Sequence, residues 1–413
     1  MEDRIWHDLY RDLKPPSLGR IVVGFNVNID RIVPVTENLL LSLPPVTGEL
    51  ALFRDRLERS MQTCTADELF VQDPVGYQQF IRHFSGTSAI GGQAGIAAVH
   101  LASAGASEVI CIAPSLGVTT QAMLRKAGVT IPGSDRVPAE QPDTVHLVFE
   151  YAPGIVPLAE GAMPRNNRFI ISPVHDPSTV LPAGDLLRRF LDAAAVCDRA
   201  FLSGYQYLTS DREFLIAAGQ LRAAKQQNPD LRIHAEWVTV ENQEITGRFI
   251  RHILPFTDSL GLNEQELGFL YRCVNPAASR DQGNAPVPAD VLAHQAREIC
   301  RSTGLVRLHL HTYGYYILVC KGSRYPEKDR DALLYASLNA APGTGGEEPG
   351  FVPEGQRALE DMAHVFGRGL SPGIFRAAEY HVIVIPSLIT RGITRTAGMG
   401  DRISSLAFAG DPF

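Results

Sequence analysis

The chain has 413 residues, of which 45% are apolar and 20% are charged, and its formal net charge at pH 7 is -7. These values are typical of a soluble globular enzyme built as one large domain, with or without a smaller appendage. The negative charge argues against a nucleic acid or an anionic membrane surface as the main partner, because both repel an acidic protein.

Neither the first residues nor the cysteines indicate an exported protein. The first seven residues lack the basic-then-apolar order of a signal peptide, and no apolar run is long enough to span a bilayer. The six cysteines are scattered and form no Cys-x-x-Cys pair, which favours reduced thiols over a disulfide frame or a zinc site. We therefore expect a cytoplasmic protein. We also expect a monomer or a small homo-oligomer.

Polar residues follow the first predicted strand, residues 20–25, which is a short run rich in β-branched residues. Asn26, Asn28 and Asp30 alternate along the chain, so their side chains point to one side, where a ligand rich in hydroxyl groups could be held. Asn and Asp are also ordinary turn formers. This segment alone does not decide between the two interpretations.

Small residues open an alanine-rich predicted helix further along. Gly91, Gly92 and Gln93 stand at its start, where small side chains let the backbone approach a ligand or a neighbouring strand closely. Tight helix–sheet packing explains them as well as a binding role does. Their spacing is not the Gly-x-Gly-x-x-Gly fingerprint of dinucleotide-binding proteins.

Strand and helix patterns alternate from here to residue 300. Arg165 and Arg168 stand at the entrance of one strand; their guanidinium groups suit phosphate oxygens, although surface arginines are often only solvated. The alternation predicts a mostly parallel sheet with helices on both faces, in which sites form at the carboxyl ends of the strands. We expect strands at 107–114, 144–151, 200–205 and 231–237, and helices at 52–62, 119–127, 186–195, 212–226 and 290–300.

Acidic side chains occur in a predicted strand and at a predicted helix start. Glu236 lies in an apolar strand, where a carboxylate is costly unless it is paired or bound to a metal. Asn263 and Glu266 lie three residues apart at a helix start. That spacing fits a capping box, and it equally fits oxygen groups that order Mg²⁺ through water.

Residues 305–316 are predicted to form a strand that carries His309 and His311 on one face. A zinc site would need a third ligand, and the spacing shows none, so we expect these histidines to pack near an aromatic ligand. Residues 340–355, rich in Gly, Pro and Glu, are predicted to be a loop, and residues 380–386 a strand.

The most informative motif is Gly398-Met399-Gly400-Asp401, which is followed by an apolar helical run. Glycines let the chain turn tightly, so that the amides of the first helical turn converge where the helix dipole favours an anion. A carboxylate at this place suits the removal of a proton from a hydroxyl group that attacks a phosphoryl group. The alternative is that Asp401 only caps the helix.

These motifs resemble those of the ADP-dependent sugar kinases, the glucokinase and phosphofructokinase branch of the ribokinase superfamily. Seven blocks follow in the family's order over almost the whole chain: residues 24–30, 90–96, 164–170, 234–236, 258–267, 309–316 and 398–401. The resemblance implies a ribokinase-like α/β fold with a mostly parallel central sheet, helices on both faces and a smaller β-rich lid. The large domain would comprise residues 1–31, 86–145 and 173–413, and the lid residues 32–85 and 146–172.

The resemblance also implies roles for individual residues. Asp401 would be the general base, and the amides of Gly398, Met399 and Gly400 would form an anion hole. Mg²⁺ would be organised by Glu236, Asn263, Glu266 and Asp401. The sugar would contact Asn26, Asn28, Asp30, Gly92, Gln93 and Arg168, and the nucleotide would contact Arg165, His311, Tyr313 and Ile385.

Two positions depart from the family pattern. Arg402 follows the aspartate where Thr or Ala is common and adds a cation near the anion hole. Residues 87–89 carry no charge where the glucokinases have an acidic and a basic residue, which argues against glucose as the substrate.

The resemblance implies Mg²⁺-dependent transfer of the β-phosphoryl group of ADP to a sugar hydroxyl. A phosphorylated acceptor such as fructose 6-phosphate is slightly favoured over glucose by the absence of an acid near Thr87 and by cations in the lid segments: Arg82, His83, Arg165 and Arg168. The arginines could equally serve the ADP phosphates. The alternatives are an ATP-dependent carbohydrate or nucleoside kinase of the same fold and a catalytically silent protein that binds sugar or nucleotide.

Overall fold

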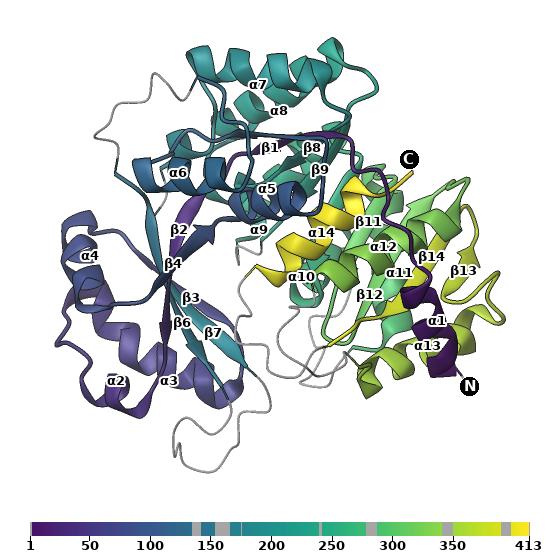
Figure 1. The fold of residues 1–413 in the computed structure, drawn as a ribbon, viewed down its shortest axis with the longest axis horizontal. Helices are drawn as coiled ribbons and strands as arrows, with labels where there is room; N and C mark the ends of the chain where they lie inside the picture. The colour runs from purple at the N-terminus through teal and green to yellow at the C-terminus, as the bar shows by residue number, and fades with distance from the viewer. Residues whose placement is uncertain are drawn as a thin grey trace.

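Two β-sheets organise the computed structural model of this chain (Figure 1). The structure describes residues 2–133, 142–152, 166–174, 176–238, 242–277, 287–340, 350–389 and 398–412. Within these ranges, none of the helices combines the length and the apolar character needed to cross a bilayer.

The larger sheet has nine strands in the order β13-β14-β12-β11-β10-β9-β8-β1-β5. Its parallel part contains β1 (Arg20–Gly24), β5 (Glu108–Ile112), β8 (Arg199–Leu202), β9 (Arg232–Glu236), β10 (Ser259–Asn263) and β11 (Arg307–His311). Three antiparallel strands extend it at one edge: β12 (Tyr315–Lys321), β13 (Ile374–Ala377) and β14 (Tyr380–Pro386).

Helices cover both faces of this sheet, because successive side chains of each buried strand point to opposite faces. Val22 packs into one hydrophobic cluster, while Ile21 and Val23 pack into the other. The first cluster includes residues of α7 (Gly184–Val196), α8 (Asp211–Gln227), α9 (Gln243–His252), α10 (Glu264–Val274), α11 (Ala289–Thr303) and α13 (Pro353–Phe366). The second includes α1 (Glu2–Arg11), α5 (Gln93–Ser103), α6 (Val118–Lys126), α12 (Pro326–Ala340) and α14 (Met399–Ala409).

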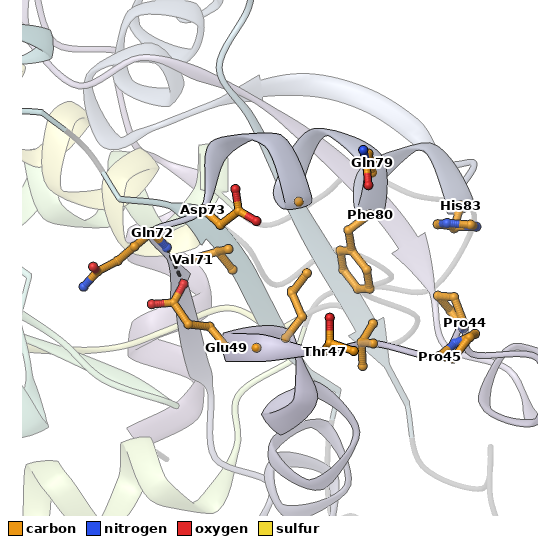
Figure 2. A pocket seen from close by; sticks show the side chains of 14 residues that line it. Pro44, Pro45, Thr47, Glu49, Val71, Gln72, Asp73, Gln79, Phe80 and His83 are labelled. Atoms are coloured by element: carbon orange, nitrogen blue, oxygen red, sulfur yellow. Dashed lines mark hydrogen bonds between the residues drawn. The ribbon is translucent and has the colours of Figure 1, made fainter.

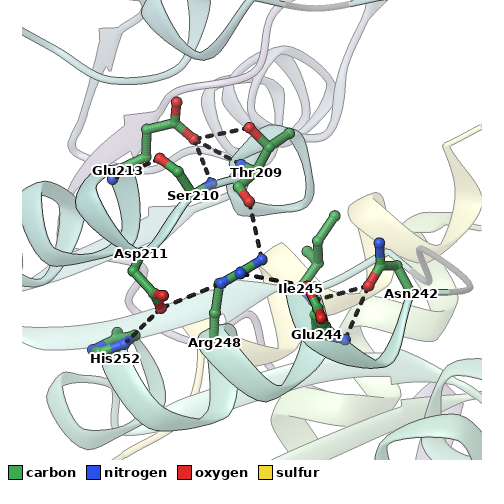
Figure 3. A network of polar contacts seen from close by, with 9 residues as sticks. All are labelled: Thr209, Ser210, Asp211, Glu213, Asn242, Glu244, Ile245, Arg248 and His252. Carbon is green, nitrogen blue, oxygen red and sulfur yellow. Dashed lines mark hydrogen bonds and ion pairs between the residues drawn. The ribbon is translucent and has the colours of Figure 1, made fainter.

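Side-chain caps fix the starts of α8 and α9 (Figure 3). Ser210 accepts a hydrogen bond from the backbone N–H of Glu213, and the Glu213 carboxylate accepts one from the N–H of Ser210. This capping box satisfies amides that the helix leaves unpaired. Arg248 of α9 then joins the two helices through Asp211 and the backbone oxygen of Thr209.

The second sheet has five strands in the order β3-β7-β6-β2-β4. They are β2 (Asn28–Pro34), β3 (Asp67–Val71), β4 (Thr87–Gly91), β6 (Val145–Tyr151) and β7 (Asn167–Pro173). A third hydrophobic cluster, which includes Phe53 and Phe80, packs α3 (Phe53–Thr63) and α4 (Pro74–Phe80) on this sheet, and α2 (Glu37–Leu41) lies beside them. Short 3-10 turns complete the described elements: Gly48–Leu52, Ile81–His83, Pro177–Thr179, Tyr205–Tyr207 and Leu254–Phe256.

The second sheet takes in residues on both sides of the expected lid boundaries. Strand β2 begins at Asn28 and β4 runs from Thr87 to Gly91, so both reach segments that the sequence placed in the large domain. The division into a large domain and a lid remains a prediction.

The structure corrects two local expectations. Residues 305–316 do not form one strand: β11 ends at His311 and β12 returns antiparallel from Tyr315. The reversal needs Gly314, whose φ of +92° is unfavourable for other residues. The loop expected at 340–355 ends earlier than predicted, because Pro353 opens helix α13, where proline's fixed φ suits the first turn.

A separate pocket of about 550 Å³ lies on the helical side of the second sheet (Figure 2). Phe80, Val71 and Leu50 contribute apolar surface, and Glu49 accepts a hydrogen bond from the backbone N–H of Gln72. His83, one of the cations named in the sequence, lines it, whereas none of the predicted metal, nucleotide or catalytic residues does.

Candidate active site

The Gly398–Asp401 motif forms the beginning of helix α14. Gly398 stands just before the helix with a left-handed φ of +74°, and a Cβ atom there would lie 2.5 Å from Cδ1 of Ile96 in α5. A Cβ atom on Gly400 would lie 2.5 Å from Nε2 of His311. Both positions therefore need glycine, and the first turn of α14 fits closely between α5 and the end of β11.

Asp401 lies in this first helical turn and is half-buried. Burial raises its pKa to about 7, and the nearby charge of Asp30 acts in the same direction. Arg168 and Arg402 oppose the rise, because a cation favours the ionised carboxyl. A carboxyl with a pKa near neutrality is suited to act as a general base.

Residues from three distant parts of the chain meet at this point. Asp30 comes from β2, Arg168 from β7 and Asp401 from α14, and the charges of the first two act on the third. The carboxyl group of Asp401 thus lies within electrostatic reach of the second sheet. The unusual Arg402 also lies beside His100, whose pKa is lowered to about 4, mainly by burial.

Asn28 and Asp30, which are predicted to bind the sugar, lie together in a buried group on β2. Asn28 donates a hydrogen bond from Nδ2 to Oδ1 of Asp30 at 2.8 Å, and both side chains are at least 94% buried. A Cβ atom on Gly91 would lie 2.0 Å from Oδ1 of Asp30, and one on Gly92 would lie 2.8 Å from Oδ1 of Asn28. The glycines therefore make room for these two side chains.

Two features of this group suit a ligand with hydroxyl groups. Oδ1 of Asn28 is buried and has no hydrogen-bond partner among the described residues, and a buried acceptor of this kind normally has one. Gln93 is also buried, and its Oε1 accepts a hydrogen bond from Gln206 at 3.1 Å. Asn26 is buried and hydrogen-bonds to Tyr207.

Glu68, Gln206 and Tyr207 were missed by the sequence analysis. Glu68 of β3 accepts a hydrogen bond from Ser172; burial raises its pKa, and the charges of Arg168 and Asp30 act on it. The one available signal was the alternation of Glu68 with Leu69 in a strand. This signal could not place Glu68 near Arg168, because β3 pairs with β7, about a hundred residues away in the sequence.

The predicted metal-organising residues lie close together. Burial raises the pKa of Glu236 well above its usual range, and the charges of Asp401 and Glu266 raise it further. The three carboxyl groups therefore form one cluster at the carboxyl ends of β9 and β10 and the start of α14.

Asn263 and Glu266 also form a complete capping box at the start of α10. Oδ1 of Asn263 accepts a hydrogen bond from the N–H of Glu266 at 3.0 Å, and Oε2 of Glu266 accepts one from the N–H of Asn263 at 2.7 Å. No three His, Cys, Asp or Glu side chains in the described ranges are placed to hold a metal ion directly. The carboxyl cluster therefore fits an ion that keeps its water shell better than one coordinated only by protein.

The residues predicted to contact the nucleotide lie in different surroundings. His311 lies against Gly400, and burial lowers its pKa to about 4, so the ring is neutral at pH 7. Tyr313 is 43% exposed in the turn after β11. Ile385 is fully buried in β14, within the core, and Arg165 lies outside the described residues.

Comparison with known proteins identifies the family. The conserved region of the ADP-specific phosphofructokinases and glucokinases matches residues 19–410. The chain belongs to this family. It is thus an ADP-dependent sugar kinase of the glucokinase/phosphofructokinase type, a transferase of glycolytic sugar phosphorylation, which confirms the expected class of enzyme.

The relatives include both branches of the family. An ADP-dependent glucose/glucosamine kinase from Pyrococcus furiosus is 25% identical, with 98% of each chain covered. An ADP-specific phosphofructokinase from Methanosarcina acetivorans is 27% identical, with 95% of this chain and 93% of the relative covered. Because these identities are nearly equal, they do not distinguish a hexose from a hexose phosphate as the acceptor.

A solved structure shares the fold. It is an ADP-dependent kinase in complex with fructose-6-phosphate and ADPbetaS, with a TM-score of 0.80, 24% identity and coverage of 99% of this chain and 96% of that one. The predicted α/β, ribokinase-like fold, with a large, mostly parallel sheet and a smaller second sheet, is confirmed.

Proposed function

We propose that this member of the family transfers the β-phosphoryl group of ADP to a hydroxyl group of a hexose or hexose phosphate and releases AMP. The observation that carries the proposal is the position of Asp401. It lies at a helix start, with a pKa near 7, and faces the charged residues Asp30 and Arg168 of the second sheet.

In the proposed reaction, Asp401 accepts the proton of the attacking hydroxyl group. Asn28, Asp30 and Gln93 hold the sugar by its other hydroxyl groups, since all three are buried, Asn28 and Asp30 in β2 and Gln93 at the start of α5, just after the strand β4 that pairs with β2. The amides of Met399 and Gly400 face the transferring group, where they stabilise its spread negative charge without any rearrangement.

We further propose that Mg²⁺ is the cofactor. When bound, it would neutralise charge on the phosphate oxygens. Glu236 and Glu266 would hold its water molecules, and Asp401 would lie next to it, which agrees with the carboxyl cluster. Asn263 would contribute indirectly, because its side chain is occupied in capping α10.

The test is an activity matrix with purified protein, in which ADP and ATP are each offered with glucose and with fructose 6-phosphate. We expect turnover with ADP and Mg²⁺ and little turnover with ATP. Phosphorylation with ATP but not ADP would contradict the proposal, and binding of both substrates without turnover would indicate a silent protein.

The acceptor is the finer question. Arg168, close to Asp401, favours a phosphorylated hexose such as fructose 6-phosphate, because a guanidinium group binds phosphate well. Glu68 favours glucose instead, because it adds a negative charge beside Arg168 and Asp30 that would repel a sugar phosphate. We keep fructose 6-phosphate as the first candidate and glucose as the second.

Exchange of Glu68 for glutamine tests whether the charge of Glu68 disfavours a phosphorylated acceptor. We expect Glu68→Gln to raise kcat/KM for fructose 6-phosphate relative to glucose by about tenfold, which corresponds to about 1.4 kcal/mol of lost repulsion. The measurement is kcat/KM for both sugars with saturating ADP. An unchanged ratio would show that Glu68 does not discriminate between the acceptors.

Exchange of Glu266 for glutamine separates its capping role from its role near the metal. The amide oxygen still accepts the hydrogen bond from Asn263, so we expect Glu266→Gln to lower the melting temperature little. The Mg²⁺ concentration for half-maximal turnover should rise about tenfold or more, because a charge that holds its water shell is lost. Lower stability with unchanged Mg²⁺ dependence would assign Glu266 to the cap alone.

We also infer a cytoplasmic location, which agrees with six cysteines that are all free thiols. A monomer or a small homo-oligomer remains a prediction.

A further inference from the structure

A row of buried polar side chains leads along the large sheet toward Glu236. Arg307, Ser259 and His234 lie side by side on the neighbouring strands β11, β10 and β9, because Ser259 is paired in register with both of the others. Glu236 follows His234 two residues later, on the same face of β9. All four side chains are at least 97% buried. The row runs from the amino ends of β10 and β11 to the carboxyl end of β9, where the candidate site lies.

The hydrogen bonds in this row have a defined direction at one end. Arg307 donates from Nε to Oδ2 of Asp411 at 2.8 Å and from Nη1 to Oγ of Ser259 at 2.9 Å. Arginine has no acceptor atom, so Ser259 must accept from it. Ser259 can still donate its hydroxyl hydrogen, and Nδ1 of His234 lies 2.8 Å from its Oγ.

The contact with Glu236 determines where the imidazole of His234 carries its proton in the metal-bound enzyme. Nε2 of His234 lies 2.9 Å from Oε2 of Glu236. A Glu236 side chain that holds the water shell of Mg²⁺ is ionised and only accepts hydrogen bonds, so Nε2 carries a hydrogen and donates it. A neutral ring then accepts at Nδ1, which agrees with a Ser259 that accepts from Arg307 and donates its own hydrogen to His234.

His309 provides a natural comparison on the adjacent strand β11. Its Nδ1 lies 2.9 Å from Oγ of Ser404, and Ser404 also hydrogen-bonds to Glu236. An ionised Glu236 only accepts, so in the metal-bound enzyme Ser404 donates to Glu236 and accepts from Nδ1–H of His309. Nε2 of His309 has no partner among the described residues, which agrees with a proton on Nδ1. The two histidines should therefore be opposite tautomers.

We propose that Arg307 is a positioning residue that acts through Ser259 and His234 to hold Glu236 in place for the kinase reaction. Arg307, itself held by Asp411, keeps His234 in its Nε2–H form, and the ring proton then holds one oxygen of Glu236 while Ser404 binds the carboxyl group as well. This inference rests on the proposed role of Glu236 at the metal, because the ionised form of Glu236 sets both tautomers.

The assignment is tested by ¹⁵N NMR of the histidine rings in the protein with Mg²⁺ and ADP bound. In the unaltered protein we expect Nε2–H for His234 and Nδ1–H for His309. Ser259→Ala removes the link but keeps the ion pair between Arg307 and Asp411, so the protein should fold. We expect this variant to change the Nδ1 signal of His234 and to leave that of His309 unchanged.

The functional consequence is measured with the same variant and with Arg307→Met. We expect each to raise the Mg²⁺ concentration for half-maximal turnover by about tenfold, as is common when a group behind a metal-organising residue is lost. The KM values for ADP and sugar should change less than about twofold, because these contacts are remote from Arg307.

Arg199→Met is the matched control. Cζ of Arg199 lies 5.9 Å from the ring centroid of Phe408, as does that of Arg307, but Arg199 donates to the backbone oxygens of Phe408 and Asp411. This variant should leave the His234 signals and the Mg²⁺ dependence unchanged.

Two results would overturn the inference. One is the Nδ1–H form of His234 in the unaltered protein. The other is unchanged His234 signals and Mg²⁺ dependence in both Ser259→Ala and Arg307→Met. Absence of kinase activity from the unaltered protein would instead refute the proposed function and leave the tautomer result standing.

Discussion

Asp401→Asn is expected to lower kcat by at least about a hundredfold, or about 2.7 kcal/mol of transition-state stabilisation. The amide keeps the size of the side chain and its place in the first turn of α14 but cannot accept the proton of the attacking hydroxyl group. Sugar affinity should change little, because the sugar is held mainly by the group around Asn28 and Asp30. Steady-state kinetics with ADP and each sugar measure both effects.

The pH dependence of the unaltered enzyme gives an independent check on Asp401. Its pKa is raised to about 7, so the carboxyl group is increasingly protonated below that pH and can no longer accept a proton. We expect kcat to fall as the pH drops through 7 and this fall to be absent from the residual activity of Asp401→Asn. Near-normal turnover of the variant at neutral pH would show that Asp401 is not the general base.

Arg168→Ala is expected to weaken the use of a sugar phosphate by about 1.5–3 kcal/mol, the value of a charge-assisted contact, which is about 10- to 150-fold in kcat/KM. Arg168 comes from β7 of the second sheet, and its charge acts on both Asp401 and His311. It therefore lies where either the acceptor phosphate or the ADP phosphates would pass. Kinetics with fructose 6-phosphate, glucose and ADP varied in turn separate these possibilities.

The comparison variant for Arg168 is Arg56→Ala. Arg56 lies on α3, at the helical side of the second sheet, and pairs with Asp67. Arg56→Ala removes one positive charge from the same part of the protein at a place away from Asp401. Both substrates should therefore be used normally. If Arg168→Ala impairs ADP and spares the acceptor, Arg168 belongs to the donor site and glucose becomes the better candidate.

Much of the fold follows from local patterns in the sequence. The β-branched run at residues 20–25 and the strand at 380–386 were expected almost as they occur, because buried strands in such sheets are continuous apolar runs. The helix start at Gly398 was also predicted, because the left-handed φ of this residue is a local requirement that favours glycine. The reversal at Gly314 was missed because a tight turn within an apolar stretch leaves little trace in its hydrophobic pattern.

The sequence by itself determined the family, because seven short motifs follow in the family's order over almost the whole chain. It also determined the class of fold, because strand and helix patterns alternate along the chain. Only the tertiary structure decided which of these residues face each other. Glu68, Arg168 and Asp401 come from three separate elements, and their charges interact because strand pairing and helix packing bring those elements together. The row of hydrogen bonds from Arg307 to Glu236 has the same origin, since the register of three parallel strands brings its members side by side, and no local pattern encodes that register.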